Sequence, residues 1–210
     1  MNNYIISIDG PAGSGKERIA KYIAKKFNFY HLDSGILYRR LASIIIKKQI
    51  NIKKINDIKY LINNIDTITN RNHKSLRKEK ISKLASKIAI IPLIRKFINN
   101  QQKIIVNKKL NNFKGCVVDG RDIGSKVFKN AKIKLFIQVN TKIRAKRRHK
   151  QLIEMGEKSI YAKILKEIIL RDKNDINRKE SPLVIAKGSI VIDNSTNFKN
   201  TIKQIKKIII

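Results

Sequence analysis

The sequence is poor in the residues that usually carry redox or metal chemistry. It has one cysteine, three histidines and no tryptophan. Cys116 has no second cysteine with which to form an intramolecular disulfide, and His31, His73 and His149 are too widely spaced for a zinc-binding motif. The apolar run Cys116-Val117-Val118 indicates a buried strand residue instead. Neither thiol nor zinc chemistry is therefore indicated.

Long apolar runs are also absent. No stretch approaches the ~20 apolar residues that a helix needs to span a bilayer. The first predicted strand begins next to Met1, which leaves no room for the basic and apolar parts of a secretory signal. With 42% hydrophobic residues, the chain can still bury a substantial core. We expect a soluble, cytoplasmic, monomeric protein of one domain, with at most a small inserted piece.

Acidic residues are scarce, since 15 Asp and Glu face 48 Lys and Arg and give a formal net charge of +33. Such a charge alone would indicate a nucleic-acid-binding protein. The lysines, however, are scattered among Ile and Asn along every segment, and the densest basic run lies between Arg144 and Lys150. Lys, Asn and Ile have A/T-rich codons, so our hypothesis is that much of the charge reflects a biased genome and lies on solvated faces. Any binding of nucleic acid is expected to be non-specific.

One early stretch combines a strand, a glycine-rich turn and a helix. The apolar run from Tyr4 to Ile8 has strand length, and the apolar residues from Ile19 onward recur with helical spacing. Between them lies Gly10-Pro11-Ala12-Gly13-Ser14-Gly15-Lys16, the phosphate-loop pattern. The glycines allow backbone N–H groups to converge on a phosphate at the start of a helix. Lys16 is then placed to reach the β- and γ-phosphates.

Polar residues follow two further predicted strands. The run Phe29 to Leu32 leads into Asp33-Ser34-Gly35, with Tyr38 and Arg39 within the next helical turn, and Cys116 to Asp119 leads into Gly120-Arg121-Asp122. Because ligands bind at the carboxyl edge of such sheets, Asp119 can reach Mg²⁺ and Arg121 can clamp phosphate. A helix N-cap at Asp33 or Ser34 and an ordinary polar turn after Asp119 are the alternatives without function.

Most of the remaining chain is predicted to be helical. Helical patterning covers about residues 37–48, 77–91, 92–109, 142–152, 159–171 and 198–207, and strands are predicted at 133–139 and 189–193. Residues 51–72 have no clear pattern. If the helix at 159–171 continues, Arg171, Asp175 and Arg178 share one face. They then form either an exposed ion pair or a clamp for a phosphate and a sugar hydroxyl.

In this order the motifs resemble those of the bacterial cytidylate kinase family nearly from end to end. The more specific ones are Leu32-Asp33-Ser34-Gly35 with Tyr38-Arg39, Asp119 to Gly124, and Arg171 to Arg178 before Ser181-Pro182-Leu183. The resemblance implies a three-layer α/β phosphate-loop NTPase fold in which helices flank a central parallel sheet. It implies one kinase domain with a core at 1–50 and 113–210 and a helical acceptor-binding insert at about 51–112. It also implies transfer of the γ-phosphoryl group of ATP to CMP or dCMP, with Mg²⁺ as cofactor.

The resemblance also assigns roles by position. The residues expected to line ATP, mainly through their backbone, are Gly10, Pro11, Ala12, Gly13, Ser14, Gly15, Lys16, Glu17 and Arg18. Those expected around the acceptor are Ser34 and Arg39 for its phosphate, Ser86, Arg95 and Asp122 for cytosine, Arg171 and Asp175 for ribose, and Tyr38, Arg121 and Arg178 beside them. Lys16, Arg121 and Arg178 are the expected catalytic residues. Asp119, at its strand end, is the expected Mg²⁺ ligand.

Two departures from the family pattern matter. Glu17 and Arg18 occupy both places at which such kinases carry a Ser or Thr near Mg²⁺. The stretch 66–75 is also shorter than the family's inserted subdomain, which usually forms a small antiparallel sheet, so we expect a reduced insert. Two alternatives stay open: the same fold acting on UMP, dTMP or a non-nucleotide alcohol, or a nucleotide- or RNA-binding protein whose catalysis has decayed.

Overall fold

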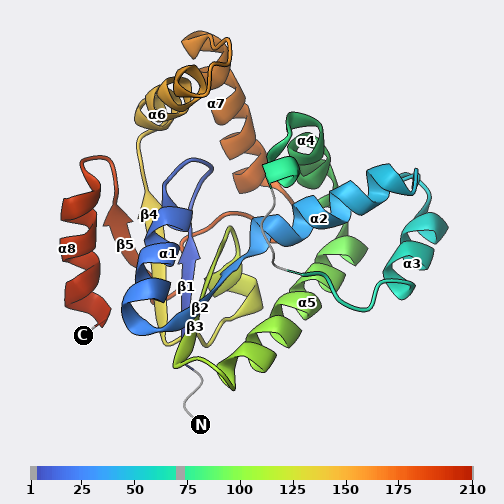
Figure 1. Ribbon diagram of the computed structural model, residues 1–210, viewed down its shortest axis with the longest axis horizontal. Helices are drawn as coiled ribbons and strands as arrows, with labels where there is room; N and C mark the ends of the chain where they lie inside the picture. The colour runs from blue at the N-terminus through green and yellow to red at the C-terminus, as the bar shows by residue number, and fades with distance from the viewer. Residues whose placement is uncertain (1–3, 70–73, 210) are drawn as a thin grey trace.

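A parallel sheet forms the centre of the fold. The computed structural model describes residues 4–69 and 74–209, and within them the sheet has five strands in the order β2-β3-β1-β4-β5 (Figure 1). The strands are β1 (Ile5–Asp9), β2 (Phe29–Asp33), β3 (Gly115–Gly120), β4 (Ile133–Gln138) and β5 (Ile190–Asp193). All neighbouring strands pair in parallel, so their carboxyl ends meet at one edge. Each predicted strand is present within about two residues of its expected bounds.

Helices connect the strands. They are α1 (Lys16–Phe27), α2 (Ser34–Lys47), α3 (Ile55–Asn63), α4 (Glu79–Ile88), α5 (Pro92–Leu110), α6 (Thr141–Glu154), α7 (Tyr161–Asn177) and α8 (Phe198–Ile209), with the short helices η1 (Lys74–Arg77) and η2 (Ile123–Val127). The helix predicted from Ser159 does continue, and α7 carries both Arg171 and Asp175. Pro92 stands at the start of α5, where its missing N–H costs nothing.

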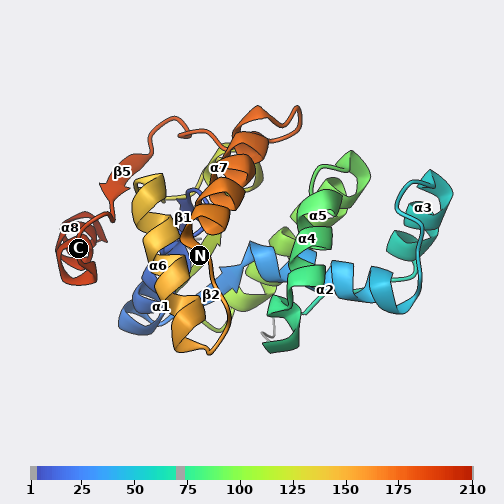
Figure 2. The ribbon, with the colours of Figure 1, turned by 90° about the horizontal axis from the view of Figure 1, so that it is seen from above.

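The apolar core lies in two layers, one on each face of the sheet. Along β3, Val117 packs in the layer that contains α1 and α8, whereas Cys116 and Val118 pack in the layer that contains α2 and α5. A strand covered on both faces needs apolar residues in succession, which explains the unbroken run seen in the sequence. In Figure 2, helices α2 to α5 extend to the side away from α8. The three-layer fold expected from the sequence is confirmed.

The insert between β2 and β3 is helical in its described part. Gln101 of α5 holds the segment before η1, since its Oε1 accepts a hydrogen bond from the Ile68 amide at 3.1 Å and its Nε2 donates to the Asp66 carbonyl at 3.2 Å. The described residues of the insert contain no antiparallel strand. Residues 70–73 of the shortened stretch 66–75 lie outside the described residues. Helix α3, which no sequence pattern predicted, buries Ile58 and Leu61.

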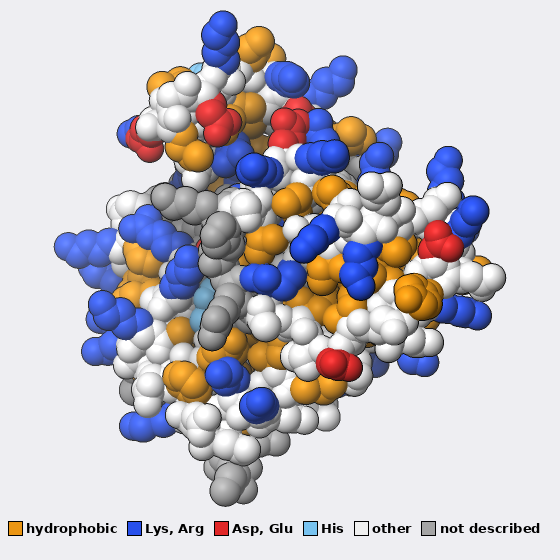
Figure 3. All heavy atoms as spheres, turned by 45° about the vertical axis from the view of Figure 1, so that its right-hand side comes forward, with side chains coloured by type: hydrophobic (Ala, Val, Ile, Leu, Met, Phe, Trp, Pro, Cys, Tyr) orange, Lys and Arg blue, Asp and Glu red, His pale blue; other side chains and the backbone are white. Residues whose placement is uncertain are grey.

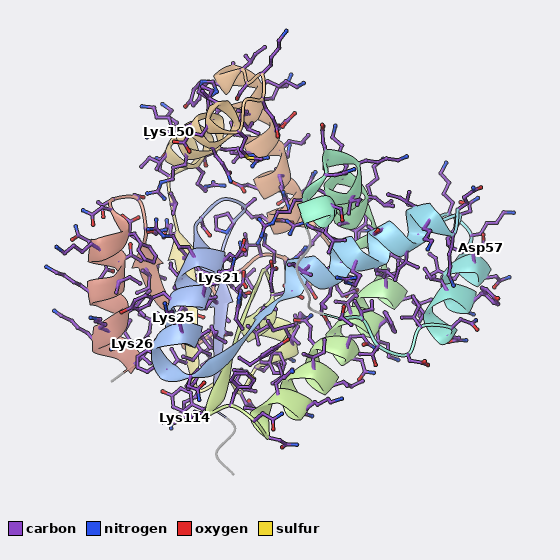
Figure 4. All side chains as sticks on the ribbon, viewed as in Figure 1. Lys21, Lys25, Lys26, Asp57, Lys114 and Lys150 are labelled. Carbon is purple, nitrogen blue, oxygen red and sulfur yellow. The ribbon has the colours of Figure 1, made fainter. Side chains whose placement is uncertain are left out.

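Basic side chains are dispersed over the surface. Figure 3 shows Lys and Arg across the whole visible face, with few acidic side chains among them. The lysines labelled in Figure 4 come from α1 (Lys21, Lys25 and Lys26), from the residue before β3 (Lys114) and from α6 (Lys150). Among the described helices, none is both long and apolar enough to pass through a membrane.

Candidate active site

The phosphate loop joins β1 to α1 in a conformation that depends on glycine. Gly15 has a φ of 85°, and a Cβ there would lie 2.5 Å from Nδ2 of Asn194. A Cβ on Gly10 would lie 2.5 Å from the carbonyl oxygen of Ile137 on β4. Both positions therefore exclude larger residues, and the loop wraps closely over the sheet edge at the N-terminus of α1, where backbone N–H groups suit phosphate.

Lys16 is buried at the base of this loop. Its side chain lies beneath the turn, and Nζ donates a hydrogen bond to the Pro11 carbonyl at 3.1 Å. Burial, and then the positive charge of Arg121, lower the pKa of Lys16 to about 7, against the opposing effect of Asp119 and Asp33. The charged form of Lys16 is disfavoured by burial, and a phosphate anion bound next to it would stabilise that form.

Two carboxylates stand side by side where β2 and β3 end. Asp33 and Asp119 are register partners, and the Oδ1 atom of Asp119 lies 2.6 Å from Nε2 of His31. Burial, and then the charge of Asp119, raise the pKa of Asp33. Asp33 also caps α2, because its Oδ1 accepts from the Ile36 amide at 3.3 Å. Ser34 turns inward as well, and its hydroxyl donates to the Asp119 carbonyl at 2.8 Å.

A third carboxylate, Asp9, fixes the chain after β3. Its two oxygens accept hydrogen bonds from the amides of Ile123 and Gly124, both at 2.8 Å. Burial raises its pKa to about 6 despite these bonds. The contact places Asp122, the residue before η2, at the carboxyl edge of the sheet beside the phosphate loop.

The arginines that directly follow β3 and α7 share the carboxylate of Asp175. Nε of Arg121 donates to Oδ2 at 2.9 Å, and Nη1 of Arg178 lies 3.5 Å from Oδ1. Nε of Arg178 donates to the Ser181 carbonyl, whereas its Nη2 is buried and has no hydrogen-bond acceptor among the described residues. A buried donor without an acceptor is costly, so this guanidinium suits an anionic ligand.

Further cationic charge gathers at the same place. Burial lowers the pKa of Arg39, and the charges of Arg77 and Arg121 add to this effect against Asp33. Arg171 lies close enough to lower the pKa of Lys16. Lys16, Arg39 and Arg171 therefore each lie within electrostatic reach of Arg121. Arg121 in turn shares the carboxylate of Asp175 with Arg178.

A buried ion pair lies deeper on the acceptor side. Nη1 of Arg95 contacts Oδ2 of Asp122 at 2.7 Å, and its other donors bind the Ala89 carbonyl at 3.1 and 2.8 Å. The guanidinium stands 5.9 Å from the ring centre of Tyr38, whose buried hydroxyl has no partner among the described residues. Burial raises the pKa of Tyr38 to about 12, so the hydroxyl stays a neutral donor. Ser86 differs from these residues: it is exposed, and its hydroxyl donates to the Ser82 carbonyl at 3.2 Å.

This geometry agrees with the comparisons with known proteins. The family model described as cytidylate kinase matches residues 6–210. The chain belongs to the cytidylate kinase family. The cytidylate kinase of Fusobacterium nucleatum is 38% identical over 207 residues, which cover 92% of this chain and 90% of that protein. The cytidylate kinase of Rickettsia bellii is 42% identical over 193 residues, covering 92% and 86%.

A likeness to a solved structure concerns the fold alone. The crystal structure of TT1252 from Thermus thermophilus superposes with a TM-score of 0.54 at 14% sequence identity. The match covers 99% of this chain and 97% of that chain.

The two residues that depart from the cytidylate kinase pattern both have partners. Glu17, in the first turn of α1, accepts hydrogen bonds through Oε1 from Lys21 at 2.7 Å and from Arg77 at 2.8 Å. Burial opposes ionisation of Glu17, but these two cations lower its pKa. The guanidinium of Arg18 lies over the ring of Phe198 on α8, 3.8 Å from its centre. The side chain of Arg18 is thus directed toward α8.

Replacing Arg18 with threonine is expected to preserve or raise the kinase activity. The exposed cation–π contact with Phe198 would be lost, which costs roughly 0.5–1 kcal/mol of stability. Threonine would return a hydroxyl to the start of α1, where related kinases carry one. Steady-state kinetics and the midpoint of urea unfolding measure both effects. A large loss of turnover would show that Arg18 itself takes part in the reaction.

Two residues that support the phosphate loop were not predicted to do so. Asn194, after β5, donates to the Ser14 carbonyl at 2.8 Å and accepts at 2.7 Å from the Thr201 hydroxyl. Arg144 of α6 donates to the Ala12 carbonyl at 3.0 Å and to both oxygens of Asp172 on α7. Asn194 stands at the carboxyl end of a strand, and the same position led to the prediction of Asp33 and Asp119 as site residues. Arg144 offers no such signal, since it stands in a run of basic residues.

Proposed function

We propose that this protein transfers the γ-phosphoryl group of ATP to CMP or dCMP. The observation that carries the proposal is the convergence of buried cationic groups between the phosphate loop and α7. Nη2 of Arg178 lacks a hydrogen-bond acceptor among the described residues, and burial, followed by the charges of Arg121 and Arg171, lowers the pKa of Lys16. Such a charge excess suits the phosphates of two nucleotides that meet head to head.

Catalysis rests on positioning and on neutralisation of charge. The acceptor is a phosphate monoester whose second pKa is about 6, so its oxygen is largely ionised at neutral pH and attacks without a general base. The phosphate loop holds the donor with its backbone N–H groups and Lys16. Arg39, Arg121 and Arg178 hold the acceptor phosphate in line and stabilise the charge that develops on the transferred group. No covalent enzyme intermediate is required.

Mg²⁺ fits the pair of strand-end carboxylates. Asp33 and Asp119 are adjacent, and burial, followed by the negative charge of Asp119, raises the pKa of Asp33. Mg²⁺ is commonly held by one or two carboxylates together with substrate phosphates. Asp33 and Asp119 would therefore hold the ion, and His31 would orient Asp119. The ion would neutralise charge on the β- and γ-phosphates.

The acceptor base would be read by the buried polar groups beside Tyr38. Arg95 and Asp122 present a donor and an acceptor fixed by their own ion pair, and the Tyr38 hydroxyl is a further donor. Asp175, held between Arg121 and Arg178, is placed for a ribose hydroxyl. For Ser86 to bind cytosine as a donor, its hydroxyl would have to give up the hydrogen bond to the Ser82 carbonyl of its own helix.

A panel of acceptors tests this function. We expect a coupled ADP-release assay to give kcat/KM values for CMP and dCMP at least about tenfold above those for UMP, dTMP, AMP and glycerol, and to lose activity when EDTA is added. The Arg95→Met variant should reduce this preference for cytosine, whereas Lys150→Met, an exposed change on α6, should not. A higher rate with UMP or glycerol would assign another acceptor. ATP binding without product for any acceptor would indicate decayed catalysis.

A further inference from the structure

We propose that Glu17 is a positioning residue of the acceptor site, which it reaches through Arg77; the inference rests on the proposed function. Glu17 stands directly after the lysine of the phosphate loop, and Arg77 ends the short helix η1 in the insert. Sixty residues of sequence separate the two side chains, yet Nη2 of Arg77 lies 2.8 Å from Oε1 of Glu17. The ion pair joins the donor side of the site to the acceptor side.

The place of Glu17 makes this role chemically reasonable. A carboxylate next to a triphosphate would repel it unless the negative charge were neutralised. Here two cations neutralise it, Lys21 from the next turn of α1 and Arg77 from the insert. Lys21 alone would suffice for an ordinary helical i,i+4 pair. Arg77 adds a contact that no local helix rule provides, and this contact joins α1 to the insert.

Restraining Arg77 restrains the acceptor side. The residue before it, Leu76, is buried, and η1 packs against both α2 and α4. Helix α2 carries Arg39, and α4 leads directly to the Ala89 carbonyl that holds Arg95. The charges of Arg77 and Glu17 act on the pKa of Arg39 in opposite directions. The pair therefore sets both the position of η1 and the net charge beside the proposed acceptor phosphate.

The size of the effect follows from the exposure of the pair. The side chain of Arg77 is 45% exposed and that of Glu17 is 32% exposed, so the interaction belongs to the weak class of ion pairs. An interaction of this class changes an equilibrium by roughly two- to fivefold. It can tune the binding of the acceptor, and it has little influence on global stability.

The test uses Glu17→Gln, Arg77→Gln, the double variant and Lys21→Gln as matched control. We expect each single change at 17 or 77 to raise the KM for CMP about threefold, with the thermal midpoint little changed. The double variant should resemble either single variant, because the two residues act as one unit. Lys21→Gln removes the other partner of Glu17 and should leave the KM for CMP at its wild-type value.

A second readout does not depend on the substrate. Amide hydrogen exchange over residues 75–88 of the nucleotide-free protein should be faster in Glu17→Gln and Arg77→Gln than in wild type and Lys21→Gln. Unchanged exchange and an unchanged KM for CMP, equal effects of Lys21→Gln, or additive effects in the double variant would overturn the inference. If the wild type fails to phosphorylate CMP, the proposed function fails, and the exchange data alone then decide whether Glu17 holds η1.

Discussion

Replacing Lys16 with methionine is expected to reduce phosphoryl transfer by more than about a thousandfold while the fold stays intact. The lysine is the one cation buried within the phosphate loop, and the proposed mechanism uses its charge on the β- and γ-phosphates. Methionine has a similar length without the charge. A coupled kinase assay measures the loss, and Lys21→Met, an exposed lysine one turn further along α1, is the matched control. A wild-type rate in Lys16→Met would refute the assignment.

The stability of Lys16→Met has a characteristic dependence on pH. Burial lowers the pKa of Lys16 from 10.5 to about 7 in the folded protein, so the unfolded chain binds more protons between these values. This residue therefore makes the wild type more stable as the pH rises from about 7 to 10.5. The variant should unfold at a higher urea concentration than wild type near pH 7, and the difference should vanish at high pH. A variant that is less stable at neutral pH would contradict the burial argument.

Replacing Arg144 with methionine is expected to lower the free energy of unfolding by about 3 kcal/mol and to raise the KM for ATP. The side chain is only 3% exposed, and it joins three parts of the protein: the Ala12 carbonyl of the loop, the Val139 carbonyl after β4, and Asp172 on α7. Its stem lies beside Gly13, where an added Cβ would stand 3.7 Å from Cβ of Arg144. Methionine would leave the Asp172 carboxylate and two carbonyls without this donor. Urea unfolding and ATP kinetics measure the two effects.

The control for this change lies on the same helix. Arg148 is exposed, and among the described residues its one side-chain hydrogen bond goes to Gln151, so Arg148→Met should cost little stability. The double variant Arg144→Met with Asp172→Asn should lose less than the sum of its parts, because the two residues form one unit. Full additivity, or equal losses in the two arginine variants, would contradict the bridging role of Arg144.

Arg144 and Arg148 lie on the same helix, and the sequence does not show that only Arg144 is buried. Local patterns predicted the strands and the phosphate loop, because an apolar run followed by a glycine-rich turn is typical of few other structures. They also placed Asp33, Asp119 and Arg121 at one edge, since parallel strands align their carboxyl ends. A basic run carries no information about which member turns inward. Arg144 turns inward because it pairs with Asp172. The two residues are 28 positions apart in the sequence, so no local pattern reveals the pair.

The insert was harder to predict for a related reason. Helix α3 has nine residues and buries only Ile58 and Leu61, too few for a helical period to stand out among so many Ile and Lys. The departure at Glu17 was visible in the sequence, but its meaning was not. Arg77, its partner, belongs to a short helix that packing rather than propensity holds in place.

The contact between Asn194 and the phosphate loop has a consequence for the order of events during synthesis. The amide of Asn194 holds the Ser14 carbonyl, and the hydroxyl of Thr201 holds Asn194 in turn. Ser14 is made long before Asn194 and Thr201. A growing chain can thus form β1 and α1 early. The hydrogen bonds that connect Thr201, Asn194 and the phosphate loop can form only after Thr201 of α8 has been made.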